Sequence, residues 1–128
     1  MFLLLHMGFG IGLVFLLMAS VQIAYSFLLA ERENSQSFKL MMLGELLLLF
    51  AVLSGEILFN MEGVSTAFKD QFMMHELLGV IMLMEYAFFI IWFMLRSGQM
   101  GKTEKKLYGI FNLLACLFII SYMSQLFF

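Results

Sequence analysis

Four long apolar stretches dominate the 128-residue sequence and constrain its fold more than any other feature. They run from Phe2 to Ala30, Leu40 to Asn60, Phe72 to Leu95 and Leu107 to Phe128. An α-helix needs about 20 apolar residues to cross the hydrocarbon core of a bilayer, and each stretch is long enough. The sequence therefore predicts an all-α integral membrane four-helix bundle. This is a single transmembrane domain over 1–128, with helices at about 2–30, 38–60, 71–96 and 106–128.

Hydrophobic residues make up 63% of the chain and charged residues only 12%, a composition that excludes an ordinary soluble domain. We expect no nucleic-acid partner. A single cysteine, Cys116, excludes an internal disulfide and a cysteine-based zinc site. The absence of proline predicts four unkinked helices. The first apolar stretch lacks a basic leading segment and is too long for the core of a signal peptide, so we interpret it as a helix.

Basic residues are concentrated in two of the three connections between the apolar stretches. The first connection holds Arg32 and Lys39, the third holds Arg96, Lys102, Lys105 and Lys106, and the middle one holds only Lys69. Loops rich in lysine and arginine stay on the cytoplasmic side of a membrane and contact anionic lipid. We therefore expect a multi-pass protein of the bacterial inner membrane, with both termini on the extracytoplasmic side.

The two histidines of the chain occur in similar contexts, near the start of the first and third stretches. His6 lies four residues before Gly10, and His75 lies four residues before Gly79, which puts each pair on one helix face. Since these two helices are expected to run in the same direction, both imidazoles should lie at one depth near the outer face. A weaker correspondence continues through the second and fourth stretches and suggests a tandem helical-hairpin repeat.

An ionisable side chain inside a membrane is costly and usually marks a functional site. Two histidines at one depth fit the axial ligands of a b-type haem, a flat apolar group that needs a narrow space between helices. A glycine one turn below each histidine leaves the helix surface bare, where a ring can approach the backbone. The expected haem contacts are His6 and His75 as iron ligands, Gly10, Gly79, Met82 and Tyr86 along the ring, and Lys69 for a propionate. Gly8 and Gly12, on another face of the first helix, form a GxxxG pair that is typical of helix packing.

Three glutamates lie inside the apolar stretches. Glu45 and Glu56 are eleven residues apart, which returns them to nearly the same helix face, and Glu85 lies near the middle of the third stretch. We expect Glu56 to hydrogen-bond a histidine ligand, and the three acids together to form a proton relay. The alternative is structural: Glu45 and Glu85 then bond serines or Asn112 on neighbouring helices.

Copper is the main alternative cofactor. Met7, Met73 and Met74 flank the histidines, and thioether and imidazole groups together bind Cu(I). The thirteen methionines are spread over the whole chain, however, which is also typical of apolar filler. Zinc fits less well, because the sequence holds no HExxH-type pair of ligands.

Several short motifs resemble one family of membrane proteins. They are Leu5-His6 in the first helix, Ser54-Gly55 late in the second, His75 opening the third, and Leu107-Tyr108-Gly109-Ile110-Phe111-Asn112 opening the fourth. In these residues the chain resembles the HemJ-type proteins and their copper-resistance-D-like relatives. The resemblance implies a bundle of the bacterial inner membrane that holds b-type haem, with His6 as an axial ligand and His75 at or beside the second functional position.

HemJ itself oxidises protoporphyrinogen, but two departures affect that implied activity. HemJ-type proteins carry a lysine early in the third helix, where this chain has Glu76 and Leu77. They also carry an Asn-Glu-x-Pro segment in the fourth helix, where this chain reads Asn112-Leu113-Leu114-Ala115. The resemblance therefore implies haem binding more than porphyrinogen oxidation.

We expect a membrane b-type cytochrome with a bis-histidine haem near the outer face, which transfers electrons to or from a quinone or a partner protein. Three alternatives stay open. One is a haem-dependent oxidoreductase that acts on porphyrin as a HemJ-like protoporphyrinogen oxidase, and another is a copper-handling membrane protein. The last is a non-catalytic accessory subunit of a larger membrane complex, in which both histidines can be replaced without loss of activity. A homo-oligomer is a further possible assembly of the chain.

Overall fold

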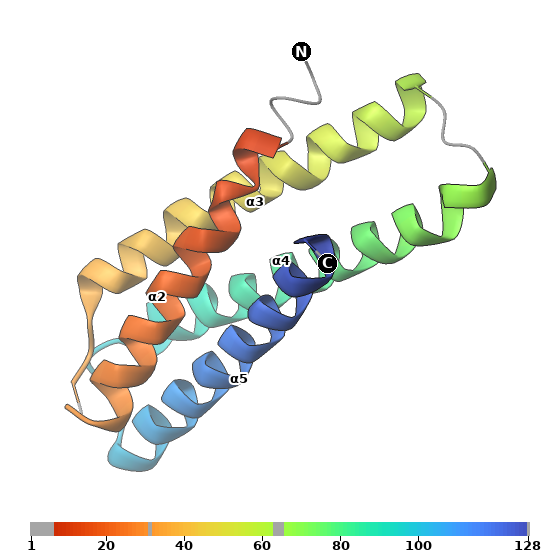
Figure 1. Cartoon of the computed structure of the whole chain (residues 1–128). Coiled ribbons are helices and arrows are strands. Elements are labelled where there is room, and N and C mark those ends of the chain that lie inside the picture. The colour runs from red at the N-terminus through yellow and green to blue at the C-terminus, as the bar shows by residue number, and fades with distance from the viewer. Residues whose placement is uncertain (1–6, 31, 63–65, 128) are drawn as a thin grey trace.

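The chain folds into four α-helices in the computed structural model, which describes residues 7–30, 32–62 and 66–127. Side chains are described in these ranges except at 58–62, 66–73 and 125–127. The helices are α2 (Ile11–Leu28), α3 (Ser35–Glu62), α4 (Thr66–Arg96) and α5 (Lys102–Phe127), as Figure 1 shows. Each contains a segment long and apolar enough to cross a membrane. The predicted all-α class with four membrane-length helices is therefore confirmed.

Several helix ends differ from those predicted from hydropathy. α3 begins at Ser35, before the predicted residue 38, because the Asn34 side chain accepts a hydrogen bond from the Ser37 backbone N–H at 3.0 Å. α4 and α5 also begin before their predicted starts at 71 and 106, since polar first turns join the apolar helix. α2 ends at Leu28, before the predicted residue 30. Hydropathy located the apolar part of each helix and missed its polar turns.

The helices form an antiparallel bundle in which α2 packs against α3 and α5, and α4 packs against the same two helices. α2 and α4 therefore lie on opposite sides of the interior. Figure 1 shows the α2–α3 and α4–α5 turns at one end, while the α3–α4 hairpin extends beyond α2 and α5 at the other. We call the end with the α2–α3 and α4–α5 turns the basic end, since Arg32, Arg96 and Lys102 lie in or beside these turns. We call the opposite end of the bundle the cavity end.

α2 and α3 touch backbone to backbone at Gly12 and Gly44. A Cβ atom added to Gly12 would lie 2.7 Å from the Gly44 carbonyl oxygen, and one added to Gly44 would lie 3.0 Å from the Gly12 carbonyl oxygen. The predicted role of Gly8 in a packing motif with Gly12 is wrong, because a Cβ atom on Gly8 would meet no described atom within 4 Å. Gly12 instead packs against a glycine of the next helix, a close approach that small residues permit.

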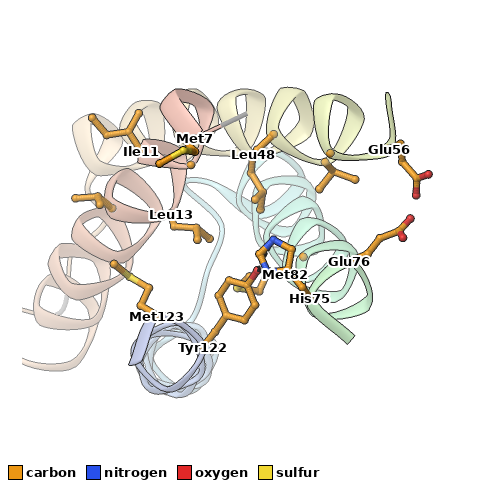
Figure 2. A pocket seen from close by; sticks show the side chains of 16 residues that line it. Met7, Ile11, Leu13, Leu48, Glu56, His75, Glu76, Met82, Tyr122 and Met123 are labelled. Atoms are coloured by element: carbon orange, nitrogen blue, oxygen red, sulfur yellow. Dashed lines mark hydrogen bonds between the residues drawn. The ribbon is translucent and has the colours of Figure 1, made fainter. Parts of the chain in front are cut away.

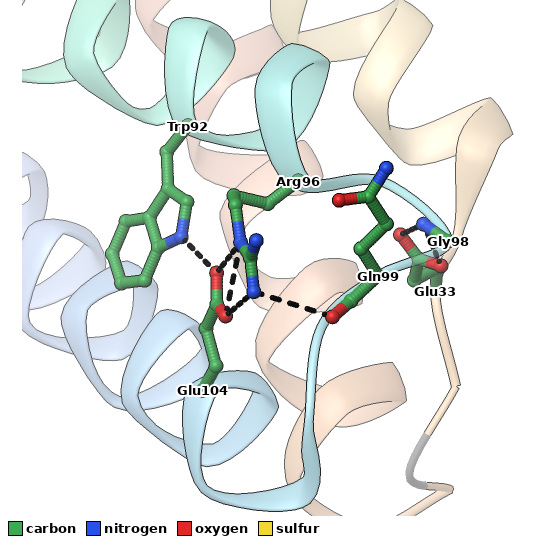
Figure 3. A network of polar contacts seen from close by, with 6 residues as sticks. All are labelled: Glu33, Trp92, Arg96, Gly98, Gln99 and Glu104. Atoms are coloured by element: carbon green, nitrogen blue, oxygen red, sulfur yellow. Dashed lines mark hydrogen bonds and ion pairs between the residues drawn. The ribbon is translucent and has the colours of Figure 1, made fainter.

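Polar contacts tie the turns of the basic end together (Figure 3). The backbone N–H of Gly98 donates to both carboxylate oxygens of Glu33, at 2.8 and 2.9 Å. Gly98 has φ +78°, a conformation that favours glycine. Glu104 accepts a hydrogen bond from the Trp92 indole at 2.8 Å and forms an ion pair with Arg96 at 2.9 Å. These contacts join the α4–α5 turn to both of its helices and to the segment before α3.

Aromatic side chains fill the bundle just inside the basic end. Four rings surround Tyr108 at centroid distances of 4.9 to 6.3 Å: those of Phe27, Phe89, Trp92 and Phe93. The Tyr108 hydroxyl donates a hydrogen bond to the Phe89 carbonyl oxygen at 2.9 Å, so its polar atom is satisfied although the residue is fully buried. The interior at this end is therefore packed with rings and contains a satisfied hydroxyl.

Candidate functional site

The cavity end contains a partly open cavity of about 480 Å³, lined by residues from all four helical segments (Figure 2). Its volume lies within the range of about 300 to 1,000 Å³ that is typical of small-molecule sites. The lining is mostly apolar, and among the described residues the side chains in it that can ionise are those of Glu56, His75, Glu76 and Tyr122. An apolar cavity with a few polar groups is the usual form of a ligand site in a protein.

Five residues predicted for the site lie around this one cavity. They are Gly10, Glu56, His75, Gly79 and Met82, from separate segments of the chain. His6 lies outside the described residues, and so does the side chain of Lys69. Met7, which follows His6 in the sequence, lines the cavity. The structure thus brings together the described part of the predicted haem site, apart from Tyr86.

His75 projects from α4 into the cavity and contacts Tyr122 of α5 (Figure 2). The Tyr122 hydroxyl oxygen is 2.6 Å from His75 Nδ1 and 3.4 Å from Nε2, and the two rings stack with centroids 5.5 Å apart. When Nδ1 carries the proton and donates it to the hydroxyl, the imidazole has its lone pair on Nε2, which is the form that binds a metal. At His75 this contact is made by Tyr122 and not by Glu56, whose carboxylate is turned away from His75 in Figure 2.

Sequence reasoning missed Tyr122 as a site residue. α5 runs antiparallel to α4, so a residue near the end of α5 lies level with one near the start of the apolar part of α4. That relation was available from the predicted topology, and it places Tyr122 at the depth of His75. The sequence did not show which face of α5 turns inward, because this helix is apolar on all sides.

The space beside Gly79 belongs to the cavity. Gly79 is buried, yet among the described atoms a Cβ there would meet only Val52 Cγ2, at 3.7 Å, which is an ordinary van der Waals distance. A longer side chain at this position would therefore extend into the cavity. The arrangement fits the expected bare helix surface one turn below His75.

Thioether groups also surround the cavity. Met7, Met82 and Met123 come from three separate segments and line it together with His75. Of the two other methionines predicted near the histidines, Met74 is 55% exposed, and the side chain of Met73 lies outside the described set. Within the described ranges, no group of three or more His, Cys, Asp or Glu side chains is placed to hold a metal ion. A metal ion bound to these side chains would therefore depend on thioether ligands.

Tyr86, predicted to border the haem, lies one turn beyond the cavity and is fully buried. Its hydroxyl oxygen is 2.8 Å from that of Ser20, which in turn is 3.2 Å from Asn112 Oδ1. Because serine has one hydroxyl proton, both contacts are satisfied when Tyr86 donates to Ser20 and Ser20 donates to Asn112. The Asn112 side-chain amide donates to the Tyr108 carbonyl oxygen at 2.9 Å. We call Ser20, Tyr86 and Asn112 the central polar cluster; it links α2, α4 and α5.

Glu45 and Glu85 do not line the cavity. The structural alternative paired them with serines or Asn112, but Asn112 contacts the Ser20 hydroxyl and donates to the Tyr108 carbonyl oxygen. Glu45 Oε1 is buried and has no hydrogen-bond partner among the residues that the structure describes. Of the three predicted relay acids, only Glu56 is thus at the cavity.

No protein-family model, curated protein or solved structure matches the chain. The fold and the cavity define a class, a four-helix multi-pass membrane protein with an apolar, histidine-containing cavity at one end.

Proposed function

We propose that the protein is a small membrane b-type cytochrome whose cavity holds haem, with His75 as an axial ligand. One observation carries the proposal. His75, Gly79 and the distant Gly10, singled out by their spacing in the sequence, line a single cavity of about 480 Å³. A single ligand can contact both of the similar sequence segments only if the two segments line the same cavity.

The residues present fit a haem group. The lining is mostly apolar, Gly79 leaves open space beside the helix backbone, and the His75 imidazole is held by the Tyr122 hydroxyl at 2.6 Å. When bound, haem supplies one-electron redox chemistry at its iron. If haem occupies the cavity, His75 would hold the iron through Nε2, Tyr122 would orient the imidazole, and the apolar side chains would exclude water.

His6, which precedes the cavity-lining Met7 in the chain, would be the second histidine that holds the iron. Two histidine ligands saturate the iron, which favours electron transfer to or from a quinone or a partner protein over oxygen chemistry. Lys69 is assigned to a haem propionate. These two assignments rest on the spacing of residues in the sequence.

The cavity end is assigned to the outer side of a bacterial inner membrane, together with both termini. Support comes from the basic residues at the opposite end, because loops rich in lysine and arginine remain cytoplasmic. A tandem hairpin repeat is supported by Gly10 and Gly79, which occupy matching places in the two halves of the sequence and line the same cavity.

Absorption spectroscopy tests the function. Protein purified in detergent from a haem-replete host should show a Soret band and an α-band that respond to reduction. His75→Ala should remove or shift both bands, whereas Tyr122→Phe should retain haem with a smaller shift. Leu77→Ala changes a 53% exposed neighbour on α4 and is the matched control, with an unaltered spectrum. Wild-type protein without these bands would contradict the proposal.

Cu(I) binding is the second candidate, because Met7, Met82 and Met123 line the cavity with His75. The volume favours haem, since a single ion needs only its ligands at bonding distance, whereas this cavity has room for an organic group. Elemental analysis separates the two. Stoichiometric copper without a haem band, lost in Met82→Leu, would favour the copper site.

A further inference from the structure

Six buried or half-buried polar groups in the middle of the bundle take no part in the proposed haem site. They are Ser20 of α2, Glu45 of α3, Glu85 and Tyr86 of α4, and Asn112 and Cys116 of α5. Each helix contributes at least one of them, near the middle of its membrane-length segment. Polar groups at this depth are costly in a membrane, so they serve either helix association or function.

The central polar cluster is explained by helix association. Ser20, Tyr86 and Asn112 satisfy one another, and Cys116 Sγ lies 3.8 Å from the Leu17 carbonyl oxygen. Glu45 differs from these groups. Its Oε1 atom is buried without a hydrogen-bond partner in the described ranges, which helix association does not explain.

Two contacts fix the register between α3 and α4: Phe38 stacks on Phe93, and Val52 lies beside Gly79. Glu45 is midway between the two α3 residues, and Tyr86 is midway between the two α4 residues, so Glu45 and Tyr86 are level. Leu48, one turn from Glu45 toward the cavity end, lines the cavity. Glu45 therefore lies level with the central polar cluster, about one helical turn from the cavity.

The titratable groups that share this region are acids or neutral. Glu45, Glu85 and Cys116 are all close enough to Tyr86 to interact with it electrostatically, and α2 contributes Ser20, which does not titrate. In the part of the chain that the structure describes, the ion pair is that of Arg96 with Glu104, at the basic end. Glu45 thus has no basic partner there, and an ionised carboxylate with a buried, unpartnered oxygen is costly.

We propose that Glu45 is a proton-binding site in the membrane interior, with the proton itself as its ligand. On release the carboxylic O–H bond breaks, the electron pair stays on the carboxylate, and the proton passes to water by way of the cavity, one helical turn away. The inference goes beyond the proposed function, because it requires no haem.

Infrared difference spectroscopy of the full chain in lipid nanodiscs tests whether Glu45 binds and releases a proton. The pH of the medium is stepped from neutral to strongly alkaline and back. The C=O stretch of a protonated carboxylic acid should be present at neutral pH, disappear on alkalinisation and return reversibly. Glu45→Gln should remove a component of this pH-dependent band, and Glu85→Gln, the matched control on α4, should retain that component.

Glu45→Asp provides a second variant that keeps the carboxyl group, and it should move the band to the frequency of an aspartic acid. Circular dichroism reports whether Glu45→Gln folds. If it does not, the shift in Glu45→Asp still tests whether the band belongs to Glu45. A wild-type protein without the band, or a band lost in Glu85→Gln and kept in Glu45→Gln, would overturn the proposal. The haem spectrum is recorded on the same samples, so a missing haem band and a missing carboxylic band are separate results.

Discussion

The two ends of the bundle differ in how their interior space is filled. At the basic end, aromatic rings surround Tyr108, and Glu33 and Glu104 accept hydrogen bonds from the α4–α5 turn and α4. At the cavity end, about 480 Å³ is open around His75. Protein interiors are normally packed as densely as organic crystals, so open space of this size points to a ligand. Rings and polar contacts thus fill one end of the bundle, while the other leaves a cavity that the proposed ligand would occupy.

Two glycines show the same contrast at the level of single atoms. A Cβ atom on Gly12 would collide with the backbone of α3, at 2.7 Å from a carbonyl oxygen. A Cβ atom on Gly79 would meet Val52 Cγ2 at 3.7 Å and point into open space. Glycine therefore serves close helix contact at one position and cavity shape at the other.

Gly12→Leu should have the largest effect. A leucine cannot fit against the Gly44 carbonyl group, so α2 and α3 must separate, and the free energy of unfolding should fall by about 3 kcal/mol. Denaturant titration in mixed micelles, followed by circular dichroism, measures this change. Gly8→Leu is the control, because a Cβ at Gly8 meets no described atom within 4 Å, and it should leave stability nearly unchanged. Equal effects of the two variants would remove the basis for a close α2–α3 contact.

Gly79→Leu should leave the fold intact and fill the cavity. We expect haem retention to fall roughly tenfold, equivalent to about 1.4 kcal/mol of binding free energy, with little change in stability. The ratio of Soret absorbance to protein, compared with Gly8→Leu, measures the effect. Full haem retention in a folded Gly79→Leu protein would show that the cavity is not the haem site.

Ser20→Ala should weaken the middle of the bundle, between the two ends. It removes the hydroxyl shared by Tyr86 and Asn112, and interhelical hydrogen bonds in membrane proteins contribute about 0.6 kcal/mol each. We expect a loss of about 1 kcal/mol in the same denaturant titration. Ser124→Ala is the control, since this exposed hydroxyl bonds the Ser121 carbonyl oxygen within its own helix at 2.8 Å. A loss no greater than that of the control would mean that the cluster is energetically neutral.

Glu104→Gln should have the smallest effect, although it alters the polar contacts of the basic end. The carboxylate is paired with Arg96 at the surface, where solvent and salt screen the attraction, while the amide oxygen can still accept from the Trp92 indole. We expect a slightly lower unfolding midpoint at low salt and no difference from wild type at high salt. A large loss that persists at high salt would show that this contact, rather than aromatic packing, holds the basic end.

Hydropathy was sufficient to locate the four helices, and residue spacing picked out five residues of the cavity lining. His75 and Gly79 lie one turn apart on one helix, so their shared face follows from helical geometry alone. Tyr122 and Ser20 were not singled out, because each acquires its role from a residue on another helix. Tyr86 was predicted to border the haem, but the structure places it in the central polar cluster. Glu56 was predicted to hydrogen-bond a histidine ligand, but its carboxylate is turned away from His75 (Figure 2).

By itself the sequence determined that this chain forms membrane-length helices, where they lie and which ends carry the positive charge. These properties depend on the residues within each segment. The contact of Gly12 with Gly44, the contact of His75 with Tyr122 and the unpartnered Oε1 of Glu45 among the described residues depend on how the helices pack. The reason is physical. A helix that is apolar on every face can turn about its axis with little change in hydrophobic free energy, so small residues and buried hydrogen bonds select the faces that meet.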